Sequence, residues 1–182
     1  MFYMVTGGSG SGKSEYAENL LLSLGKRRRI YIATMIPWDE ECRHKIARHR
    51  RMRAEKGFET IEQYRDLETA AIGETAGEQK TAILLECLSN LTANELYSPE
   101  RKEDIVQKIS HGVLALKDQC ADLVMVTNEV FSDGQLYDPE TREYQRILGA
   151  LNRQLAAKAD HVTEVVYGIP ILIKQNETGD RR

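Results

Sequence analysis

A glycine-rich stretch near the start of the chain constrains the fold more than any other feature. It matches the pattern G-x-x-x-x-G-K-[ST], and its residues are Gly7, Gly8, Ser9, Gly10, Ser11, Gly12, Lys13 and Ser14. An apolar run at residues 2–6 precedes it, and residues 13–24 carry apolar side chains at helical spacing. Strand, glycine-rich turn and helix in this order are the context in which the pattern forms a phosphate-binding loop.

The chemistry of this loop predicts binding of a nucleoside triphosphate. Glycines let backbone N–H groups close around phosphate oxygens, and the N-terminus of the following helix adds a positive dipole. We expect Lys13 to reach the β- and γ-phosphates and Ser14 to hold Mg²⁺. The loop by itself identifies neither the base nor the reaction.

Stretches of strand and helix character alternate along most of the sequence. Apolar runs typical of strands lie at residues 2–6, 29–34, 58–62, 81–86, 123–127, 162–167 and 171–174. Helical patterns lie at residues 13–24, 37–56, 67–76, 88–96, 104–119 and 142–158. This order predicts an α/β fold: a mainly parallel sheet flanked by helices, with an antiparallel hairpin at its C-terminal edge. We expect one domain over residues 1–175 and a polar tail at residues 176–182.

Composition excludes several classes of protein. A hydrophobic fraction of 41% is too high for a disordered chain, and a net charge of −3 argues against a general nucleic-acid binder. The three cysteines are widely spaced, which supports neither a disulfide framework nor a zinc site and fits a reducing cytoplasm. No run approaches the roughly 20 apolar residues of a membrane helix, so we expect no membrane insertion.

Two carboxylates follow buried-strand patterns. Glu86 ends the run TAILLE, and Glu129 comes shortly after the run LVMVT. Ligands of open α/β sheets bind at the carboxyl ends of the strands, where a carboxylate can hold Mg²⁺ or act as a base. Either residue could instead be an acid in the first turn of a helix.

A strongly basic helical stretch spans residues 43–53. It could be a solvated charged face or, less in keeping with its lack of aromatic residues, an RNA contact. Helical spacing places Cys42, Ile46, His49 and Arg53 on one face, so His49 should point toward the body of the protein. Neighbouring arginines would keep its imidazole neutral and able to act as a nucleophile, although a packed or phosphate-contacting histidine is also consistent with the pattern.

Further segments connect these features to a known family. In chain order they read VTGGSGSGKS, YIAT, HRRMR, ETIE, LLECLSN, VTNEV, LNRQLAAKADHV and GIPILIK. Over roughly residues 3–174 the sequence resembles the bifunctional adenosylcobinamide kinase and adenosylcobinamide-phosphate guanylyltransferase family of cobalamin biosynthesis. The resemblance implies a RecA-like P-loop fold and a homo-oligomer that acts on small molecules rather than nucleic acid.

The resemblance also implies two reactions. In the first, ATP or GTP phosphorylates the aminopropanol hydroxyl of adenosylcobinamide. In the second, GTP forms a GMP–histidine intermediate, and the guanylyl group then passes to adenosylcobinamide phosphate. The histidine of the family lies in the motif H-R-x-x-R, which only residues 49–53 match, so the resemblance assigns this role to His49.

The nucleotide contacts of the family fall on the glycine-rich loop and on a second set of residues. That set is Ala33, Thr34, Met35, Arg50, Arg51, Met52, Arg53, Glu62 and Glu86. One segment departs from the family, because residues 131–137 replace the G-x-G-I-V-P loop that usually follows N-E-V. This loop is a candidate contact for the corrinoid or for phosphate.

Two other interpretations fit the residues. A different P-loop small-molecule kinase would lose activity with Lys13 but keep its turnover without His49. A nucleotide-binding module without catalysis would bind a nucleotide, or RNA in a salt-sensitive manner, and form no product.

Overall fold

The computed structural model describes most of the chain. The described residues are 1–25, 27–37, 40–54, 56–73, 80–100, 104–131, 134–135 and 137–176. Within the second helix, some side chains lie outside the description: those of Glu41, Cys42, Lys45, Arg48, His49, Met52 and Ala54. The expectations for residues 74–76 and for the tail at 177–182 also fall outside it.

The described strands form one seven-stranded sheet in the order β3-β2-β4-β5-β1-β6-β7. Their bounds are β1 Phe2–Thr6, β2 Arg28–Ala33, β3 Phe58–Glu62, β4 Thr81–Glu86, β5 Asp122–Val126, β6 His161–Val166 and β7 Ile169–Gln175. Neighbouring strands are parallel except β6 and β7, which pair antiparallel. The predicted α/β fold with an antiparallel C-terminal edge is therefore confirmed.

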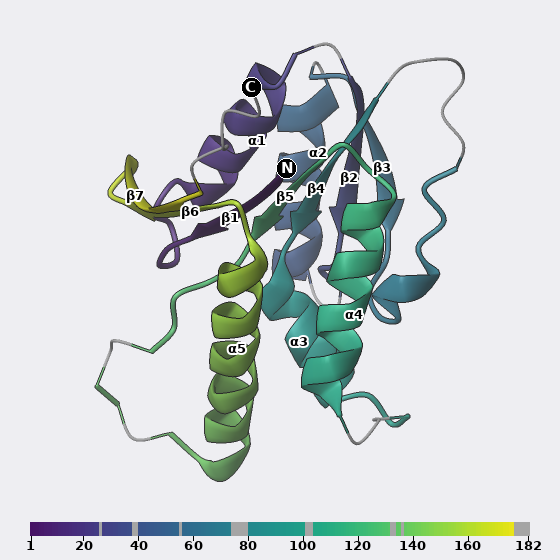
Figure 1. Ribbon diagram of the computed structural model, residues 1–182. Helices are drawn as coiled ribbons and strands as arrows, with labels where there is room; N and C mark the ends of the chain where they lie inside the picture. Colours follow the sequence, from purple (N-terminus) through teal and green to yellow (C-terminus); the bar gives the residue numbers. More distant parts are fainter. Residues whose placement is uncertain are drawn as a thin grey trace.

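Helices cover both faces of the sheet (Figure 1). Their bounds are α1 Lys13–Ser23, α2 Glu40–Ala54, α3 Leu88–Leu96, α4 Ile105–Asp118 and α5 Pro139–Lys158, with a 3-10 turn, η1, at Leu67–Thr69. One buried cluster joins α1 to the sheet through residues such as Leu21 and Leu84, and the other joins α3, α4 and α5 to the opposite face. None of the described helices is long and apolar enough to cross a membrane.

The central strands explain why the sequence shows unbroken apolar runs. In β4, Ala82 and Leu84 belong to the cluster on the α1 face, whereas Ile83 and Leu85 belong to the cluster under α3 and α4. Because both faces of a parallel strand are covered, each of its positions needs an apolar side chain. This burial fixes the strands so that their carboxyl ends meet at one edge, where the glycine-rich loop follows β1 and Glu86 ends β4.

Over its described part, residues 67–73, the helix predicted at residues 67–76 is wrong, because the structure has only the turn η1 there. Ala70 is already extended, and the carbonyl of Ile72 accepts a hydrogen bond of 2.8 Å from Arg28 Nη1. Leu67, Ala70 and Ile72 are all buried in the cluster that contains α4. Apolar spacing that looked helical thus belongs to an extended segment anchored on the core.

Two boundaries also differ from the sequence prediction. Helix α5 starts at Pro139 rather than residue 142, because Asp138 caps it by accepting hydrogen bonds of 2.9 Å from the backbone N–H groups of Glu140 and Thr141. The last hairpin turns at Tyr167 and Gly168, both with positive φ, and not across residues 168–170. Pro170 lies within β7, where an edge strand tolerates the missing N–H.

Candidate functional site

The glycine-rich loop folds around the ammonium group of Lys13. This side chain is nearly buried, and its Nζ donates a hydrogen bond of 3.0 Å to the carbonyl oxygen of Gly8. Gly7 has no room for a side chain, since an added Cβ would lie 2.5 Å from the carbonyl oxygen of Val165. Gly12 precedes α1 with a φ of 89°, a conformation that favours glycine. The loop therefore has the backbone needed to wrap an anion beside a buried cation.

Burial lowers the pKa of Lys13, and the nearby Cys87 and Glu86 oppose this shift. A cation in this position has lost part of its hydration and gains most from a negatively charged ligand. This electrostatic arrangement suits the phosphates of a nucleotide.

Glu86 at the end of β4 links the loop to the strands beside it. Its Oε1 accepts a hydrogen bond from the hydroxyl of Ser14, and its Oε2 accepts one of 3.2 Å from the hydroxyl of Tyr31. Burial, followed by the charge of Glu86, raises the pKa of Tyr31, so its hydroxyl remains a donor at neutral pH. The structure thus brings together the two residues, Ser14 and Glu86, that the sequence suggested as metal ligands.

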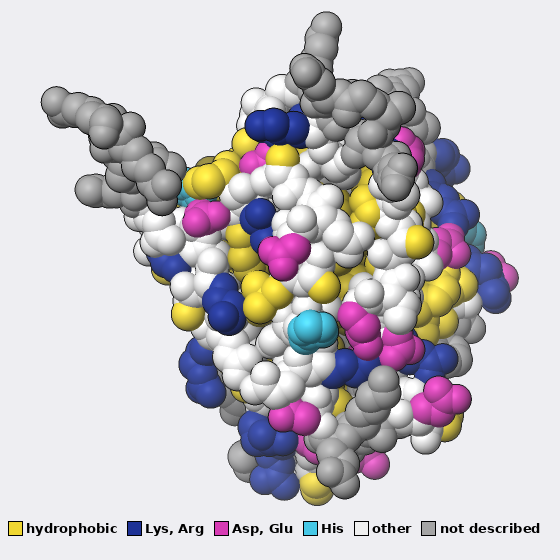
Figure 2. Space-filling view, turned by 45° about the vertical axis from the view of Figure 1, so that its right-hand side comes forward, with side chains coloured by type: hydrophobic (Ala, Val, Ile, Leu, Met, Phe, Trp, Pro, Cys, Tyr) yellow, Lys and Arg dark blue, Asp and Glu magenta, His cyan; other side chains and the backbone are white. Residues whose placement is uncertain are grey.

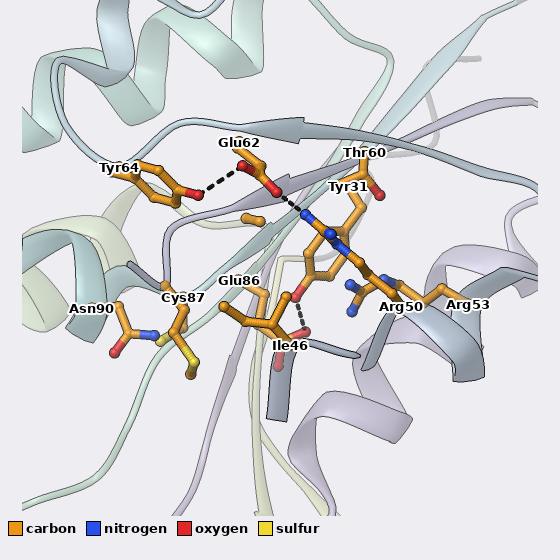
Figure 3. A pocket seen from close by; sticks show the side chains of 12 residues that line it. Tyr31, Ile46, Arg50, Arg53, Thr60, Glu62, Tyr64, Glu86, Cys87 and Asn90 are labelled. Carbon is orange, nitrogen blue, oxygen red and sulfur yellow. Dashed lines mark hydrogen bonds and ion pairs between the residues drawn. The ribbon is translucent and has the colours of Figure 1, made fainter. Parts of the chain in front are cut away.

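A pocket opens beside this group, between α2 and the carboxyl ends of β2, β3 and β4. Figure 3 shows the side chains that line it: Tyr31, Ala33, Met35, Ile46, Arg50, Arg53, Thr60, Glu62, Tyr64, Glu86, Cys87 and Asn90. Six of them were suggested by the sequence as nucleotide contacts. We call this cavity the arginine pocket.

The outer part of the arginine pocket holds a row of polar side chains (Figure 3). The guanidinium of Arg50 forms an ion pair with Oε1 of Glu62, and the hydroxyl of Tyr64 donates a hydrogen bond of 2.7 Å to Oε2. The side chains of Arg50 and Glu62 are 55% and 42% exposed, so this pair adds at most about 1 kcal/mol to stability. Its effect is to orient groups at the pocket mouth that can hydrogen-bond to a ligand.

The inner wall is formed by Arg53, which is only 4% exposed. Its guanidinium carbon lies 3.4 Å from the centre of the Tyr31 ring. Its Nη1 is 3.8 Å from Oε1 of Glu18, and Lys56 forms an ion pair with the same carboxylate. The end of α2 is thereby fastened to α1 through a buried glutamate.

Arg53 also has two buried nitrogens, Nε and Nη1, without a hydrogen-bond acceptor among the described residues. Buried polar groups in native proteins nearly always have a partner. Arg53 lines the pocket, and the ion pair of its Nη1 with Glu18 is too long for a hydrogen bond, so its guanidinium is suited to bind an anionic group there.

The comparisons with known proteins agree with this geometry. A family model described as cobinamide kinase / cobinamide phosphate guanyltransferase matches residues 3–173. The chain belongs to this family. It is therefore an enzyme of the kinase and guanylyltransferase class, as the sequence resemblance implied.

Three relatives of this cobinamide kinase and guanylyltransferase chain match nearly their full lengths. The bifunctional adenosylcobalamin biosynthesis protein CobU of Escherichia coli (strain K12) is 34% identical over 96% of this chain and 100% of its own. The protein of the same name from Salmonella typhimurium is 35% identical, with the same coverage of both chains. CobP of Pseudomonas aeruginosa is 29% identical over 94% of this chain and 96% of its own.

The helix that carries the family motif H-R-x-x-R is α2. Ile46 and Arg53 line the arginine pocket, and His44, which lies off their face, is exposed. The side chains of His49 and Met52 lie outside the described residues, so their predicted roles stay predictions. Arg51 is exposed and is not among the lining residues of the arginine pocket.

Thr34 is placed differently from its neighbours. It is fully buried, its Oγ1 donates a hydrogen bond of 2.8 Å to the carbonyl of Cys87, and the Cys87 N–H donates one of 2.7 Å back to it. Its own carbonyl accepts a hydrogen bond from Asn94. The side chain of Thr34 thus holds the ends of β2 and β4 together, while Ala33 and Met35 face the pocket.

Some pocket residues were not foreseen. Tyr31 was predicted only as part of the strand at residues 29–34, and Tyr64 follows the predicted strand 58–62 without any motif. The signals that could have drawn attention to them were the segment YIAT, which begins with Tyr31, and the segment ETIE, which ends two residues before Tyr64. Glu129 lies away from the arginine pocket and lines another hollow that includes Ser9 of the glycine-rich loop.

Proposed function

We propose that this enzyme phosphorylates adenosylcobinamide and transfers GMP from GTP to adenosylcobinamide phosphate, with one nucleotide site serving both reactions. The observation that carries the proposal is the position of Glu86. It bonds to Ser14 of the phosphate loop and also lines the arginine pocket. A triphosphate on the loop would therefore extend toward the motif H-R-x-x-R on α2.

In the kinase reaction, the substrate hydroxyl attacks the γ-phosphorus of ATP or GTP. The bond to the β–γ bridging oxygen breaks, and the nucleoside diphosphate leaves with that electron pair. Lys13 neutralises charge on the transferred group, and the backbone N–H groups of the loop hold the phosphates in place.

In the guanylyltransferase reaction, we assign the nucleophile to His49. Its neutral imidazole nitrogen attacks the α-phosphorus of GTP, and pyrophosphate leaves. A phosphate oxygen of adenosylcobinamide phosphate then attacks the same phosphorus, which breaks the N–P bond and restores the histidine. Arg50 and the unsatisfied guanidinium of Arg53 support this role, because both can neutralise phosphate charge beside the motif.

The ligand set at the phosphate loop fits Mg²⁺. A hydroxyl and a carboxylate oxygen are hard donors, and Mg²⁺ in nucleotide sites needs only one or two carboxylates beside phosphates and water. Ser14 and Glu86, already in contact, would hold it. When bound, the ion neutralises charge on the phosphates during both reactions.

Product analysis tests this proposal directly. We expect purified enzyme with adenosylcobinamide, GTP and Mg²⁺ to form adenosylcobinamide phosphate and then adenosylcobinamide-GDP, detected by chromatography and mass spectrometry. Removal of Mg²⁺ with EDTA should stop both steps, since the phosphates would lose their counter-charge. Absence of both products with folded, GTP-binding enzyme would contradict the proposal.

The family resemblance also implies a homo-oligomer, and β7 supports this. As Figure 1 shows, the β6–β7 hairpin projects beyond the helices at the edge of the sheet. Four of its side chains are large, apolar and exposed: Ile169, Ile171, Leu172 and Ile173. A long apolar edge strand of this kind pairs readily with another chain, so we propose that β7 contacts a second copy.

Charged substitutions in β7 test the homo-oligomer. We expect the wild type to show a mass by light scattering that is a multiple of 20.7 kDa, and the double variant Ile171→Lys, Ile173→Lys to show a monomer. The control is Tyr97→Lys, which adds charge at an exposed position outside β7, at the C-terminal end of α3. A monomeric wild type, or an unchanged mass in the double variant, would rule out this interface.

The net charge of −3 argues against a nucleic-acid partner, and one face of the molecule agrees with it. On the face shown in Figure 2, the described lysine and arginine side chains are interspersed with aspartate and glutamate rather than gathered in one patch. Nucleic-acid binders usually present a continuous basic surface. We therefore keep small molecules as the substrates of this enzyme.

A further inference from the structure

A second pocket lies against the phosphate loop, away from α2. It is formed by the tip of the loop at Ser9, the segment after β5 and the first turns of α5. Its polar lining residues are Ser9, Asn128, Glu129, Tyr137, Thr141, Tyr144 and Gln145. We call this hollow the α5 pocket.

The wall of the α5 pocket is fastened to the nucleotide site. The backbone N–H of Glu129 donates a hydrogen bond of 3.0 Å to the carbonyl oxygen of Gly7. The amide of Asn128 donates one of 2.7 Å to the hydroxyl of Ser89, which lies 3.0 Å from the sulfur of Cys87 in the arginine pocket. The walls of the two pockets are therefore joined through Gly7 of the phosphate loop and through Ser89.

The lining of the α5 pocket differs in charge from the arginine pocket. Two arginines line the arginine pocket, whereas no lysine or arginine is among the described residues that line the α5 pocket. A second triphosphate would lack counter-charge there. Amide and hydroxyl side chains instead suit a ligand that carries carboxamides and a hydroxyl and is not an anion.

Tyr144 and Gln145 are held in fixed positions for this role. The hydroxyl of Tyr144 lies 3.3 Å from the carbonyl oxygen of Ser89, and the amide of Gln145 donates a hydrogen bond of 2.9 Å to the carbonyl oxygen of Val130. Burial raises the pKa of Tyr144 to about 12, so this phenol stays neutral. Apart from the carboxylate of Glu129, the described polar lining is thus uncharged, and these two side chains are already held in place.

We propose that the α5 pocket binds the corrinoid substrate, with its hydroxyl-bearing arm passing over Ser9 to the phosphate loop. This inference rests on the proposed function, because it takes adenosylcobinamide as the acceptor. A corrinoid carries carboxamide groups around its ring, which match the amide and hydroxyl lining. The arginine pocket remains for the nucleotide, so donor and acceptor approach the phosphates from opposite sides.

Glu129 occupies the position of a base in this arrangement. Its Oε1 accepts a hydrogen bond of 2.8 Å from the N–H of Phe131, and it lines the α5 pocket together with Ser9. When the hydroxyl oxygen attacks the γ-phosphorus, its proton passes to the Glu129 carboxylate, and the nucleoside diphosphate leaves. The later guanylyl transfer starts from a phosphate oxygen and needs no such base.

Corrinoid binding by matched tyrosine variants tests the site. The corrin chromophore lets binding of adenosylcobinamide be followed by equilibrium dialysis and visible absorption. We expect Tyr137→Ala to weaken binding by about tenfold or more, because it removes an aromatic wall of the pocket. The control is Tyr97→Ala, which removes a tyrosine from a different hollow, between α3 and Ile36. It should bind adenosylcobinamide as the wild type does.

A second readout separates this site from the nucleotide site. Guanylylation of the enzyme by GTP, measured without corrinoid, should be unchanged in Tyr137→Ala. Glu129→Gln should lower the kinase rate by about 10²-fold, the usual effect of losing a general base. Tyr137→Phe, which keeps the ring, provides a folded comparison if the alanine variant is unstable.

The outcomes distinguish the inference from the proposed function. Unchanged corrinoid binding in Tyr137→Ala, or an equal loss in Tyr97→Ala, would overturn the site. If Tyr137→Ala lost both its guanylylation by GTP and its binding of corrinoid, the α5 pocket would be assigned to the nucleotide. That result would also overturn the corrinoid site. Failure of the wild type to phosphorylate adenosylcobinamide would instead contradict the proposed function.

Discussion

Replacement of His49 by alanine is expected to abolish covalent labelling of the enzyme by GTP. Wild-type enzyme incubated with Mg²⁺ and α-³²P-GTP should carry a label that is labile in acid and stable in base, as a phosphoramidate is. His49→Ala should carry none, and its guanylyl transfer should fall by at least about 10³-fold because the nucleophile is gone. The kinase reaction should continue, since it does not pass through the histidine.

The structure offers a matched control on the same helix. His44 lies on α2 and is exposed, off the face that Ile46 and Arg53 turn toward the arginine pocket. His44→Ala should therefore keep both the label and the transfer rate. Both variants remove an imidazole from α2, so a difference between them reports on chemistry rather than on the stability of the helix.

Other results would contradict the assignment of His49 as the nucleophile. A label that persists in His49→Ala would mean that another group is the nucleophile. A wild type that binds GTP and forms adenosylcobinamide-GDP without any label would favour direct transfer between the two substrates. Full turnover of His49→Ala would support a P-loop kinase without a covalent intermediate.

The sequence alone was sufficient to predict those parts of the site whose positions are set by local structure. The glycine-rich loop follows a strand and opens a helix, so Lys13 and Ser14 have their places fixed by local geometry. Glu86 could be assigned because a strand buried on both faces shows an unbroken apolar run, and the next residue lies at the ligand edge. These are short-range signals, and the structure places all three residues together.

Contacts between segments that are far apart in the chain left no recognisable pattern in the sequence. Glu18 is an acidic residue on α1 that could have been exposed, yet it is 1% exposed and pairs with Arg53 and Lys56 at the far end of α2. The wrong prediction of helix for residues 67–73 has the same cause, because apolar residues of an extended segment were spaced as in a helix. Only the packed core decides between these alternatives.

Replacement of Lys13 by alanine is expected to disable both reactions. Its ammonium group is nearly buried and donates a hydrogen bond to the Gly8 carbonyl oxygen, a position from which it can also reach phosphate oxygens. Loss of one preorganised charge at a reacting phosphate costs about 10²–10³ in rate. We therefore expect kcat/KM for GTP to fall by that factor in the kinase assay and in the labelling of His49.

The pH dependence of kcat/KM for GTP tests the role of Lys13 independently of the alanine variant. Because burial lowers the pKa of Lys13, its protonated form is lost at a lower pH than that of an exposed lysine. In the free enzyme, kcat/KM for GTP should then decline on the alkaline side, before the pH at which ordinary lysines titrate. Lys13→Arg keeps its charge over this range, so whatever activity it retains should not show the decline.

Comparison of the two assays decides whether one nucleotide site serves both reactions. With a single site, Lys13→Ala lowers phosphorylation of adenosylcobinamide and labelling by GTP together. If phosphorylation is lost and labelling persists, the GTP that forms the intermediate must bind without the phosphate loop, and the arginine pocket would hold a separate nucleotide. The bond between Ser14 and Glu86 favours the first result, because it joins the loop to that pocket through one carboxylate.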